Sequence, residues 1–358
     1  MGLEVQLKRD HVVEAQAEDE AAKRMKVELD PAERKRPEAE GVAKFIRFFN
    51  TVEDEEELTD YYAAEAKQLR KFWESVFLGR YGYFEDETAI CAKRFTDKLA
   101  TWGGHLQGNL QIFSVKVTGL SGGLQFPLDV YGMFATRDQV DHNRNIIFHR
   151  KRDNCQTLTQ EDLSLVLTGP SRAVNFGDPV ILEVELKVKS NTESEDRVLS
   201  FLAPRLKSSA FVPDSSMFKK SYTSKLSTLE FTVGHVFYSL GATIRAKVIE
   251  GSWLEDCRAQ FAASTASIED EKVVLLRFGD ENVPLDGDNI SLSRSVVSVE
   301  LKGLLIVSAS VRRSSKEAKD EAVEDHAVFF TPFKMGRSYG ELNVGFCKIE
   351  VTVAWSLF

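Results

Sequence analysis

Residues 180–189 read VILEVELKVK, and the order of residue types in this stretch decides the fold class. Apolar and charged side chains alternate along it with a period of two. Successive side chains of a β-strand point to opposite faces of the sheet, so this period predicts a strand with one buried face. Antiparallel sheets are the sheets that leave their other face in water. The apolar face comprises Leu182, Val184, Leu186 and Val188, and the charged face comprises Glu183, Glu185, Lys187 and Lys189.

Runs of the same kind recur from residue 108 to the end of the chain, where 349–357 repeats the design. Clusters of Gly, Pro and Asp that favour turns separate these runs. Many short strands with frequent turns are typical of antiparallel β-sandwiches. The other predicted strands are 110–118, 127–137, 144–149, 163–168, 228–240, 242–249, 258–267, 272–278, 290–302, 304–312 and 326–332.

A polar stretch, 208–225, divides this region in two. We therefore predict a first β-sandwich unit over 105–207 and a second over 208–358, packed on the first. The sequence SRAV at 171–174 is echoed by SRSV at 293–296, and VELK occurs at both 184–187 and 299–302. The spacing between the two tetrapeptides differs in the two halves. The echoes raise the hypothesis that the units are a tandem pair.

The residues before the strands differ sharply in composition. Residues 1–40 contain no aromatic residue and 19 charged ones, so we predict a disordered charged tail over 1–44. A helical segment over 45–104 follows, with one amphipathic helix from Glu53 to Gly79 and a second from about residue 86 to 102. The overall prediction is mainly β (α+β overall), with two amphipathic helices before the sandwiches.

Two basic clusters in the tail have the layout of a two-part nuclear localisation signal. The simpler interpretation is a solvated charged tail. The clusters comprise Lys23, Arg24, Arg34, Lys35 and Arg36.

Charge and hydropathy limit the classes of partner and compartment. The net charge of −9 argues against a nucleic acid or an anionic membrane held by bulk charge. We see no apolar leader and no run long enough to span a bilayer. The four cysteines are widely spaced, which fits a reducing compartment. We expect an intracellular protein, cytoplasmic or nuclear or both, that is not secreted.

Residues 119–123 read GLSGG and match G-x-S-x-G, the turn that presents the nucleophile of serine hydrolases. That turn needs a strand before the serine and a helix after it. Here predicted strands lie on both sides, so the glycines supply positive φ for a hairpin loop and Ser121 is a polar loop residue. We predict no catalytic residue and a protein that is not an enzyme.

The stretch 136–155 gathers Asp, His and Arg residues without a tight zinc-ligand spacing. Its acidic loop could bind calcium, but the favoured interpretation is a solvated hairpin loop. We predict no metal and no cofactor. Sandwiches bind with their end loops, here 119–127, 138–145 and 280–289. The candidate binding residues are Ser121, Asp138, Asp141, His142, Arg144, Asp286 and Asp288.

Longer stretches resemble a grass-expanded plant family of unknown function. That family's domain also forms the C-terminal half of jasmonate-induced ribosome-inactivating proteins. The likeness covers roughly 105–358 and rests on length and order. It implies a β module of stress or defence proteins to which no activity is assigned. The matching stretches begin with LQIFSVKVTGLSGGLQFPLDVYGMFATRD (110–138) and end with GELNVGFCKIEVTVAWSLF (340–358).

The ribosome-inactivating enzymes, as the resemblance implies, remove one adenine from ribosomal RNA with a Glu and an Arg three residues apart on one helix. The nearest pair here, Glu65 and Arg70, is five apart and lies about 140° apart around a helix. We therefore expect a non-catalytic interaction module with an unknown ligand, whose partner is a protein or is associated with the ribosome. The alternatives are a ribosome-inactivating or accessory role, and a calcium-dependent lipid- or phosphate-binding sandwich.

Overall fold

The computed structural model describes residues 60–98, 106–177, 179–207, 214–253, 257–278, 284–313 and 324–357. Residues Glu53–Phe358 form one compact unit. The charged tail predicted over 1–44, with its two basic clusters, lies outside the described residues.

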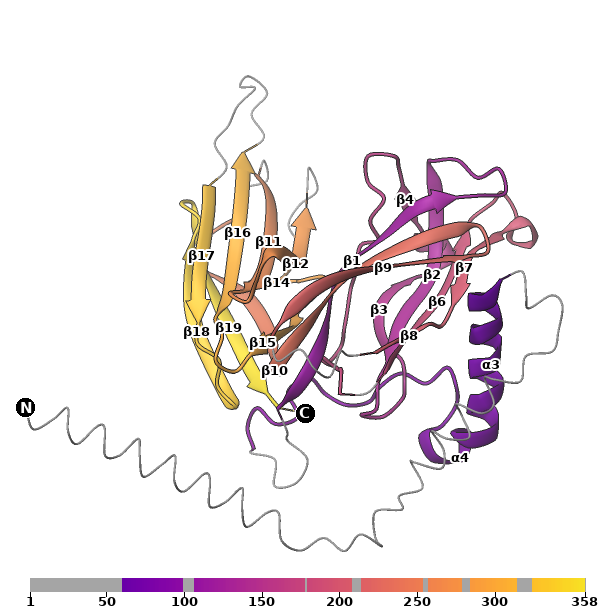
Figure 1. Ribbon diagram of the computed structural model, residues 1–358. Helices are drawn as coiled ribbons and strands as arrows, with labels where there is room; N and C mark the ends of the chain where they lie inside the picture. The colour runs from indigo at the N-terminus through magenta and orange to yellow at the C-terminus, as the bar shows by residue number, and fades with distance from the viewer. Residues whose placement is uncertain are drawn as a thin grey trace, which may run out of the picture. The chain divides into compact units, whose positions relative to one another are not determined.

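A first β-sandwich is built from two facing sheets (Figure 1). Its core is continuous and apolar, with Val115, Phe134 and Phe231 fully buried. One sheet contains β1 (Gln107–Leu120), β5 (Val174–Asn175), β9 (Ser216–Ser224) and the first half of β10 (Ser227–Gly251). The other contains β2 (Leu128–Arg137), β3 (Asn145–Arg150), β4 (Gln156–Leu158), β6 (Val180–Val188), β7 (Arg197–Leu202) and β8 (Arg205–Leu206).

A second sandwich follows around a separate core, in which Phe261, Val351 and Trp355 are buried. One of its sheets continues through the second half of β10 and includes β13 (Leu285–Asp286), β14 (Asn289–Ile290), β15 (Val296–Glu300), β18 (Met335–Asn343) and β19 (Cys347–Ser356). The facing sheet has the order β12 (Ile268–Phe278), β11 (Cys257–Thr265), β16 (Leu305–Arg313) and β17 (Glu324–Phe330).

Strand β10 is shared by both sandwiches. Its residues before Ser239 pair with β1 and β9, and its residues after Ser239 pair with β15 and β19. The changeover lies next to Tyr238, whose φ of 48° is rare for a bulky residue. The predicted strands 228–240 and 242–249 are therefore one strand, and the cores divide within β10 and not in the polar stretch 208–225.

The strand pairing of the first sandwich is repeated in the second, in the same order. The pairs β1–β5, β1–β10, β2–β3, β2–β6, β6–β7 and β9–β10 correspond to β10–β15, β10–β19, β11–β12, β11–β16, β16–β17 and β18–β19. SRAV and SRSV lead into the equivalent strands β5 and β15, whereas the two VELK sequences are not equivalent. The predicted mainly β fold of tandem antiparallel sandwiches is confirmed.

Among the described residues two helices precede the strands, and the first of them lies where a helix was predicted. In α3 (Tyr61–Val76), Leu69, Phe72 and Trp73 are buried, and the helix contacts β7 and β9. The Asp60 carboxylate caps α3 by accepting from the Ala63 N–H at 3.0 Å, and it also accepts from the Lys225 N–H of the β9–β10 turn at 2.7 Å. The helix is thereby tied to the first sandwich.

The second helix, α4 (Leu78–Tyr81), is short and follows α3 directly. Residues 86–98, where we predicted it, contain no helix: Glu87 forms an isolated bridge with Arg144, and residues 92–96 form turns. The reason lies in the backbone: the Thr88 N–H donates to the Arg144 carbonyl at 2.9 Å, and the Arg144 N–H donates to the Asp86 carbonyl at 3.0 Å. Bonding to the β2–β3 loop replaces the intrahelical bonds that the apolar spacing suggested.

An acid-sensitive cluster holds the start of β7 to β2. The Asp196 carboxylate, 3% exposed, accepts from the Arg152 Nε at 2.7 Å, the Tyr131 hydroxyl at 2.6 Å and the Ser190 N–H at 2.7 Å. Arg152 above all holds the pKa of Asp196 well below its usual range. Burial, with the Asp196 carboxylate, raises the pKa of Tyr131 to about 12.

A carboxyl group whose pKa is lower in the folded than in the unfolded state stabilises the fold at a pH above its unfolded-state pKa of about 3.9. This stabilisation is lost as the pH falls through the folded-state pKa. Asp196→Asn is therefore expected to be less stable than the wild type at pH 6, with a smaller difference at pH 3. Urea unfolding at both pH values measures this. An equal difference at both would contradict the assignment.

Candidate functional site

The loop between β2 and β3 carries four of the predicted binding residues. We predicted a solvated hairpin loop, but the charged side chain of Asp138 in this loop is buried. The Arg172 guanidinium donates to both Asp138 oxygens, at 2.7 and 2.8 Å, and to Asp141 at 2.9 Å. The side chains of Arg172 and Asp138 are each 1% exposed. Both carboxylates are thus already bonded to a cationic side chain, which disfavours calcium binding by this loop.

Arg144 and His142 have packing partners in the same region. Arg144 and Arg137 share the Glu183 carboxylate, with N–O distances of 2.5 and 2.7 Å. The His142 ring stacks on Phe77, with ring centres 5.1 Å apart. The cluster joins the segment after α3 to the first sandwich. Its arginines and carboxylates form ion pairs with one another.

Ser121 lies in an exposed loop that connects two different sheets, because β1 pairs with β10 and β2 pairs with β3 and β6. The predicted hairpin is therefore wrong: a hairpin would join strands that pair with each other. The Ser121 N–H donates to the Leu226 carbonyl at 2.9 Å. Gly122 and Gly123 have φ values of 62° and 75°, as predicted for these glycines. A strand and not a helix follows, so the geometry differs from the hydrolase turn.

Asp286 and Asp288 lie at the exposed turn of the β13–β14 hairpin. This hairpin belongs to a different sheet from β2 and β3. Lys247 Nζ is 3.9 Å from Asp288. The neighbouring residues 279–283 of the predicted loop lie outside the described residues. Within the described ranges, no group of three or more His, Cys, Asp or Glu side chains could hold a metal ion.

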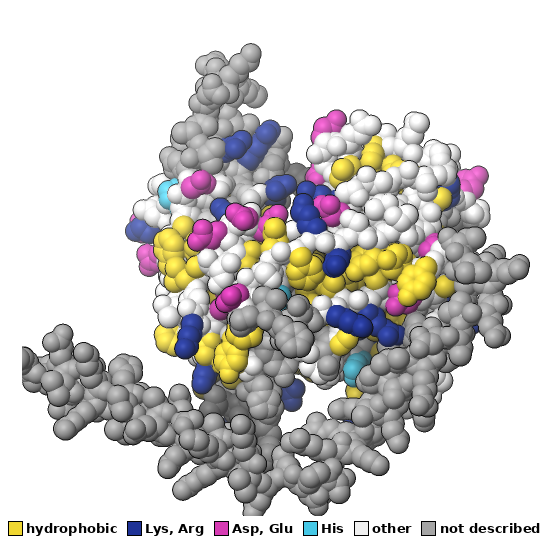
Figure 2. Space-filling model, viewed as in Figure 1, with side chains coloured by type: hydrophobic (Ala, Val, Ile, Leu, Met, Phe, Trp, Pro, Cys, Tyr) yellow, Lys and Arg dark blue, Asp and Glu magenta, His cyan; other side chains and the backbone are white. Residues whose placement is uncertain are grey.

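A cleft of about 300 Å³ between the two sandwiches was not predicted. Its lining comes from β1, from residues 162–167, from β12 and from Ser293 and Arg294. Figure 2 shows Lys, Arg, Asp and Glu side chains meeting in the hollow between the two bodies. We call it the inter-sandwich cleft. Its charged lining residues other than Arg294 are Lys116, Asp162, Glu271, Lys272 and Arg277.

Both long walls of the inter-sandwich cleft are extended chain. On one side lies β12, the edge strand of its sheet, which pairs with β11 among the described strands. On the other side, residues 163–165 run along β1: the Val117 N–H donates to the Leu163 carbonyl at 3.0 Å, and the Leu165 N–H donates to the Val115 carbonyl at 2.9 Å. Val166, which follows, is 44% exposed in the cleft.

Arg294 lines the cleft and joins the second sandwich to the first. Its guanidinium donates to the carbonyls of Gly169 and Ile112, both at 2.7 Å, so a residue of the second sandwich binds the backbone of the first. Burial lowers its pKa to about 10. Arg294 stands at the place in the repeat that Arg172 occupies in the first sandwich, so one repeated Ser-Arg motif serves two different joints.

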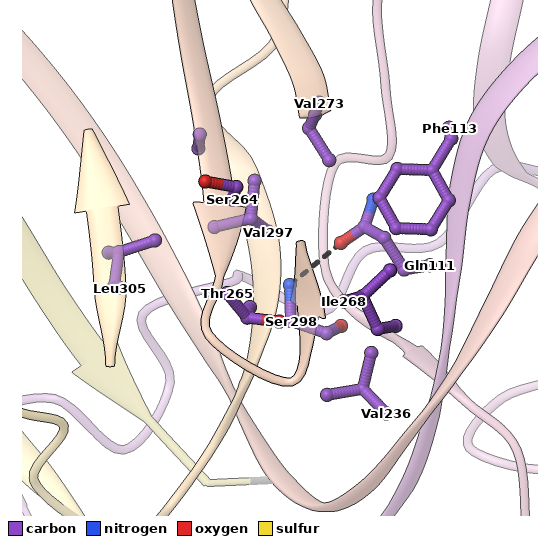
Figure 3. Close-up of a pocket in the computed structure, with 11 residues that line it drawn as sticks. Gln111, Phe113, Val236, Ser264, Thr265, Ile268, Val273, Val297, Ser298 and Leu305 are labelled. Atoms are coloured by element: carbon purple, nitrogen blue, oxygen red, sulfur yellow. Dashed lines mark hydrogen bonds between the residues drawn. The ribbon is translucent and has the colours of Figure 1, made fainter. Parts of the chain in front are cut away.

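A second, much smaller cavity lies between the sandwiches (Figure 3). It measures about 10 Å³, which is room for about one water molecule. Gln111 Oε1 accepts from the Ser298 N–H at 2.9 Å there, and the Thr265 hydroxyl has no hydrogen-bond partner among the described residues. The cavity is too small for an organic ligand.

The fold therefore defines the chain as a tandem antiparallel β-sandwich protein in which one strand is common to both sandwiches. A family model described as a domain of unknown function (DUF6598) matches residues 109–353, which is more than half of the chain. The chain belongs to this family. The resemblance to a family of unknown function is confirmed, and the plant and ribosome-inactivating associations stay predictions.

Other comparisons add little. No curated protein matches. Among solved structures, a pair of C2 domains from extended synaptotagmin 2 is similar at 9% identity and a TM-score of 0.24, covering 76% of this chain and 100% of that chain. Human GIVD cytosolic phospholipase A2 is similar at 10% identity and a TM-score of 0.20, covering 70% of this chain and 33% of that chain. Likenesses this weak support no functional argument.

Among the described residues, no helix has the length and apolar character needed to cross a membrane.

Proposed function

We propose that this protein is a non-catalytic interaction module that holds an extended peptide segment of a partner protein in the inter-sandwich cleft. One observation carries the proposal: an edge strand, β12, forms a wall of the inter-sandwich cleft. An edge strand presents backbone N–H and C=O groups that a peptide can meet by adding a strand. One such carbonyl, that of Leu275, already accepts from the Arg294 N–H at 2.9 Å.

The size and lining of the cleft support this kind of occupant. Its volume of about 300 Å³ lies at the lower end of the range for small-molecule pockets, about 300–1,000 Å³. The apolar side chains of Val166 and Val274 lie among charged ones. Such a surface can take alternating side chains of an extended segment, while the backbone groups of the wall supply affinity.

The enzyme alternative finds less support on α3. Arg70 forms an ion pair with Glu85 and lies 4.5 Å above the Phe84 ring. Burial raises the pKa of Glu65, and the positive charge of nearby Arg205 opposes this increase in part. The two residues of the nearest N-glycosidase-like pair thus have separate neighbours. This separation favours a module without catalysis.

The biological setting is proposed from the sequence resemblance alone. We place the module in plant stress or defence, inside the cell, in the cytoplasm or the nucleus. Replacing Lys23, Arg24, Arg34, Lys35 and Arg36 with alanine in a fluorescently tagged full chain tests the import signal. An unchanged nuclear fluorescence in this variant would show that the two clusters are not an import signal.

The binding proposal is tested by selecting a displayed random peptide library on the full chain. Val166→Trp fills the cleft, and Val198→Trp is the matched control, since Val198 is a similarly exposed valine of β7 outside the cleft lining. Enriched peptides are expected to bind the wild type and the Val198 variant, and to lose about tenfold or more affinity for the Val166 variant. Equal binding to all three proteins, or no enrichment, would overturn the proposal.

A further inference from the structure

We propose that the segment bound in the cleft is acidic, and that four basic side chains recognise it: Lys116, Lys272, Arg277 and Arg312. We call these residues the basic track. The inference rests on the proposed function and adds the chemical class of the partner.

The first argument is the pairing of charges. The arginines at 137, 144, 152 and 172 each contact a carboxylate, at N–O distances of 2.5–2.9 Å. Among the described residues, the basic track has no ion-pair partner; Arg277 Nε donates to the amide oxygen of Gln260 at 2.9 Å. The chain contains more Asp and Glu residues (55) than Lys and Arg residues (46). Its internal ion pairs leave these four cations available to a ligand.

The second argument is their arrangement. Arg277 of β12 lines the inter-sandwich cleft and also a second hollow on the outer face of the β12–β11–β16–β17 sheet. That hollow also contains Arg312, which pairs in register with Arg258 on the neighbouring strand. Three arginines, Arg258, Arg277 and Arg312, and one carboxylate, that of Asp325, line this hollow, so its cations outnumber its carboxylates. In Figure 2, Lys and Arg side chains continue from the upper end of the second sandwich into the hollow between the bodies.

The third argument separates an acidic peptide from a nucleic acid. Asp162 and Glu271 lie in the same cleft, where they repel a uniformly charged phosphate backbone but leave room for a peptide with separated charges. Single-stranded nucleic acids are held by stacking on exposed aromatic rings. The aromatic residues that line the two hollows, Phe113 and Phe278, are 8% and 7% exposed. The edge of β12 also offers backbone bonds that suit a peptide.

The test uses three fluorescent ten-residue peptides, in which Thr alternates with Glu, Gln or Lys, and a ten-nucleotide oligo-dT. Binding to the full chain is followed by fluorescence anisotropy at 50 and 300 mM salt. The Glu peptide is expected to bind tightest, and more weakly at high salt because screening shortens the reach of exposed charges. Lys116→Glu and Lys272→Glu are each expected to weaken it about tenfold. Lys151→Glu is the matched control, an exposed lysine outside both hollows.

The outcomes separate the two proposals. Equal binding of the Gln and Glu peptides, abolished by Val166→Trp, would overturn the acidic preference and leave the peptide-binding function standing. Tighter binding of oligo-dT would overturn the peptide as the partner. No binding of any probe would overturn the acidic segment, and the library selection would then decide the proposed function independently. Loss of Glu-peptide binding in the Lys116 and Lys272 variants, with Lys151→Glu unaffected, would support the basic track.

Discussion

Replacing Arg172 by methionine is expected to lower the free energy of unfolding by about 3–5 kcal/mol. The substitution leaves the Asp138 carboxylate buried without its cation. Two backbone donors, the N–H groups of Val140 and Asn175, remain on this carboxylate at 3.0 and 2.8 Å, and they cannot neutralise its charge. Urea unfolding of the full chain, followed by circular dichroism, measures the loss.

A second substitution separates the lost charge partner from lost packing. In the Arg172→Met background, Asp138→Asn removes the unpaired charge but leaves one oxygen for two backbone N–H donors, so it is expected to restore only part of the lost stability. A loss below about 1 kcal/mol for Arg172→Met, or no recovery in the double variant, would show that the ion pair does not hold the β2–β3 loop.

Replacing Arg294 by methionine is expected to cost about 2–4 kcal/mol, because the buried carbonyl of Gly169 loses its donor and the two sandwiches lose a direct bond. Arg197→Met is the matched control. Arg197 is exposed and also donates to a carbonyl, that of Gly122 at 2.8 Å, so its loss is expected to cost less than about 1 kcal/mol.

The Arg294 variant also tests the joint between the sandwiches. If Arg294 holds them together, its removal is expected to change the exchange rates of backbone amides around Phe113 and Leu275, which flank the cleft. Equal destabilisation by Arg294→Met and Arg197→Met would show that the buried Arg294 bonds between the sandwiches contribute no more to stability than an exposed bond.

Much of the fold was predictable because period-two runs need no tertiary information. β6 matches the run at 180–189 to within one residue, and β19 covers most of the run at 349–357. β9 was missed because an edge strand has few apolar residues: only Phe218 and Tyr222 of its nine residues pack against the core. The predicted helix was wrong over its described residues, 86–98, because bonds to a loop more than 50 residues away replaced the intrahelical ones.

The candidate site was harder to predict. Asp138, Asp141, His142 and Arg144 stood out because they are adjacent in sequence, yet Arg172, Glu183 and Phe77 bind them internally. Lys272 and Arg277 share β12, whereas Lys116 lies on β1 far earlier in the sequence, and only the packing of the two sandwiches brings the two strands to one cleft. The repeated Ser-Arg was the one visible signal near the cleft, and it suggested duplication.

Amide hydrogen exchange, with and without a saturating peptide, tests the central claim most directly. The probe is the alternating Glu-Thr peptide or, if that peptide does not bind, one enriched from the library. We predict slower exchange at residues 271–277 of β12 and at 163–167, the two walls of the cleft. The edge strand β18 provides an internal comparison and is expected to stay unchanged. Peptide binding that leaves β12 unprotected, or that protects β18 in its place, would contradict the account.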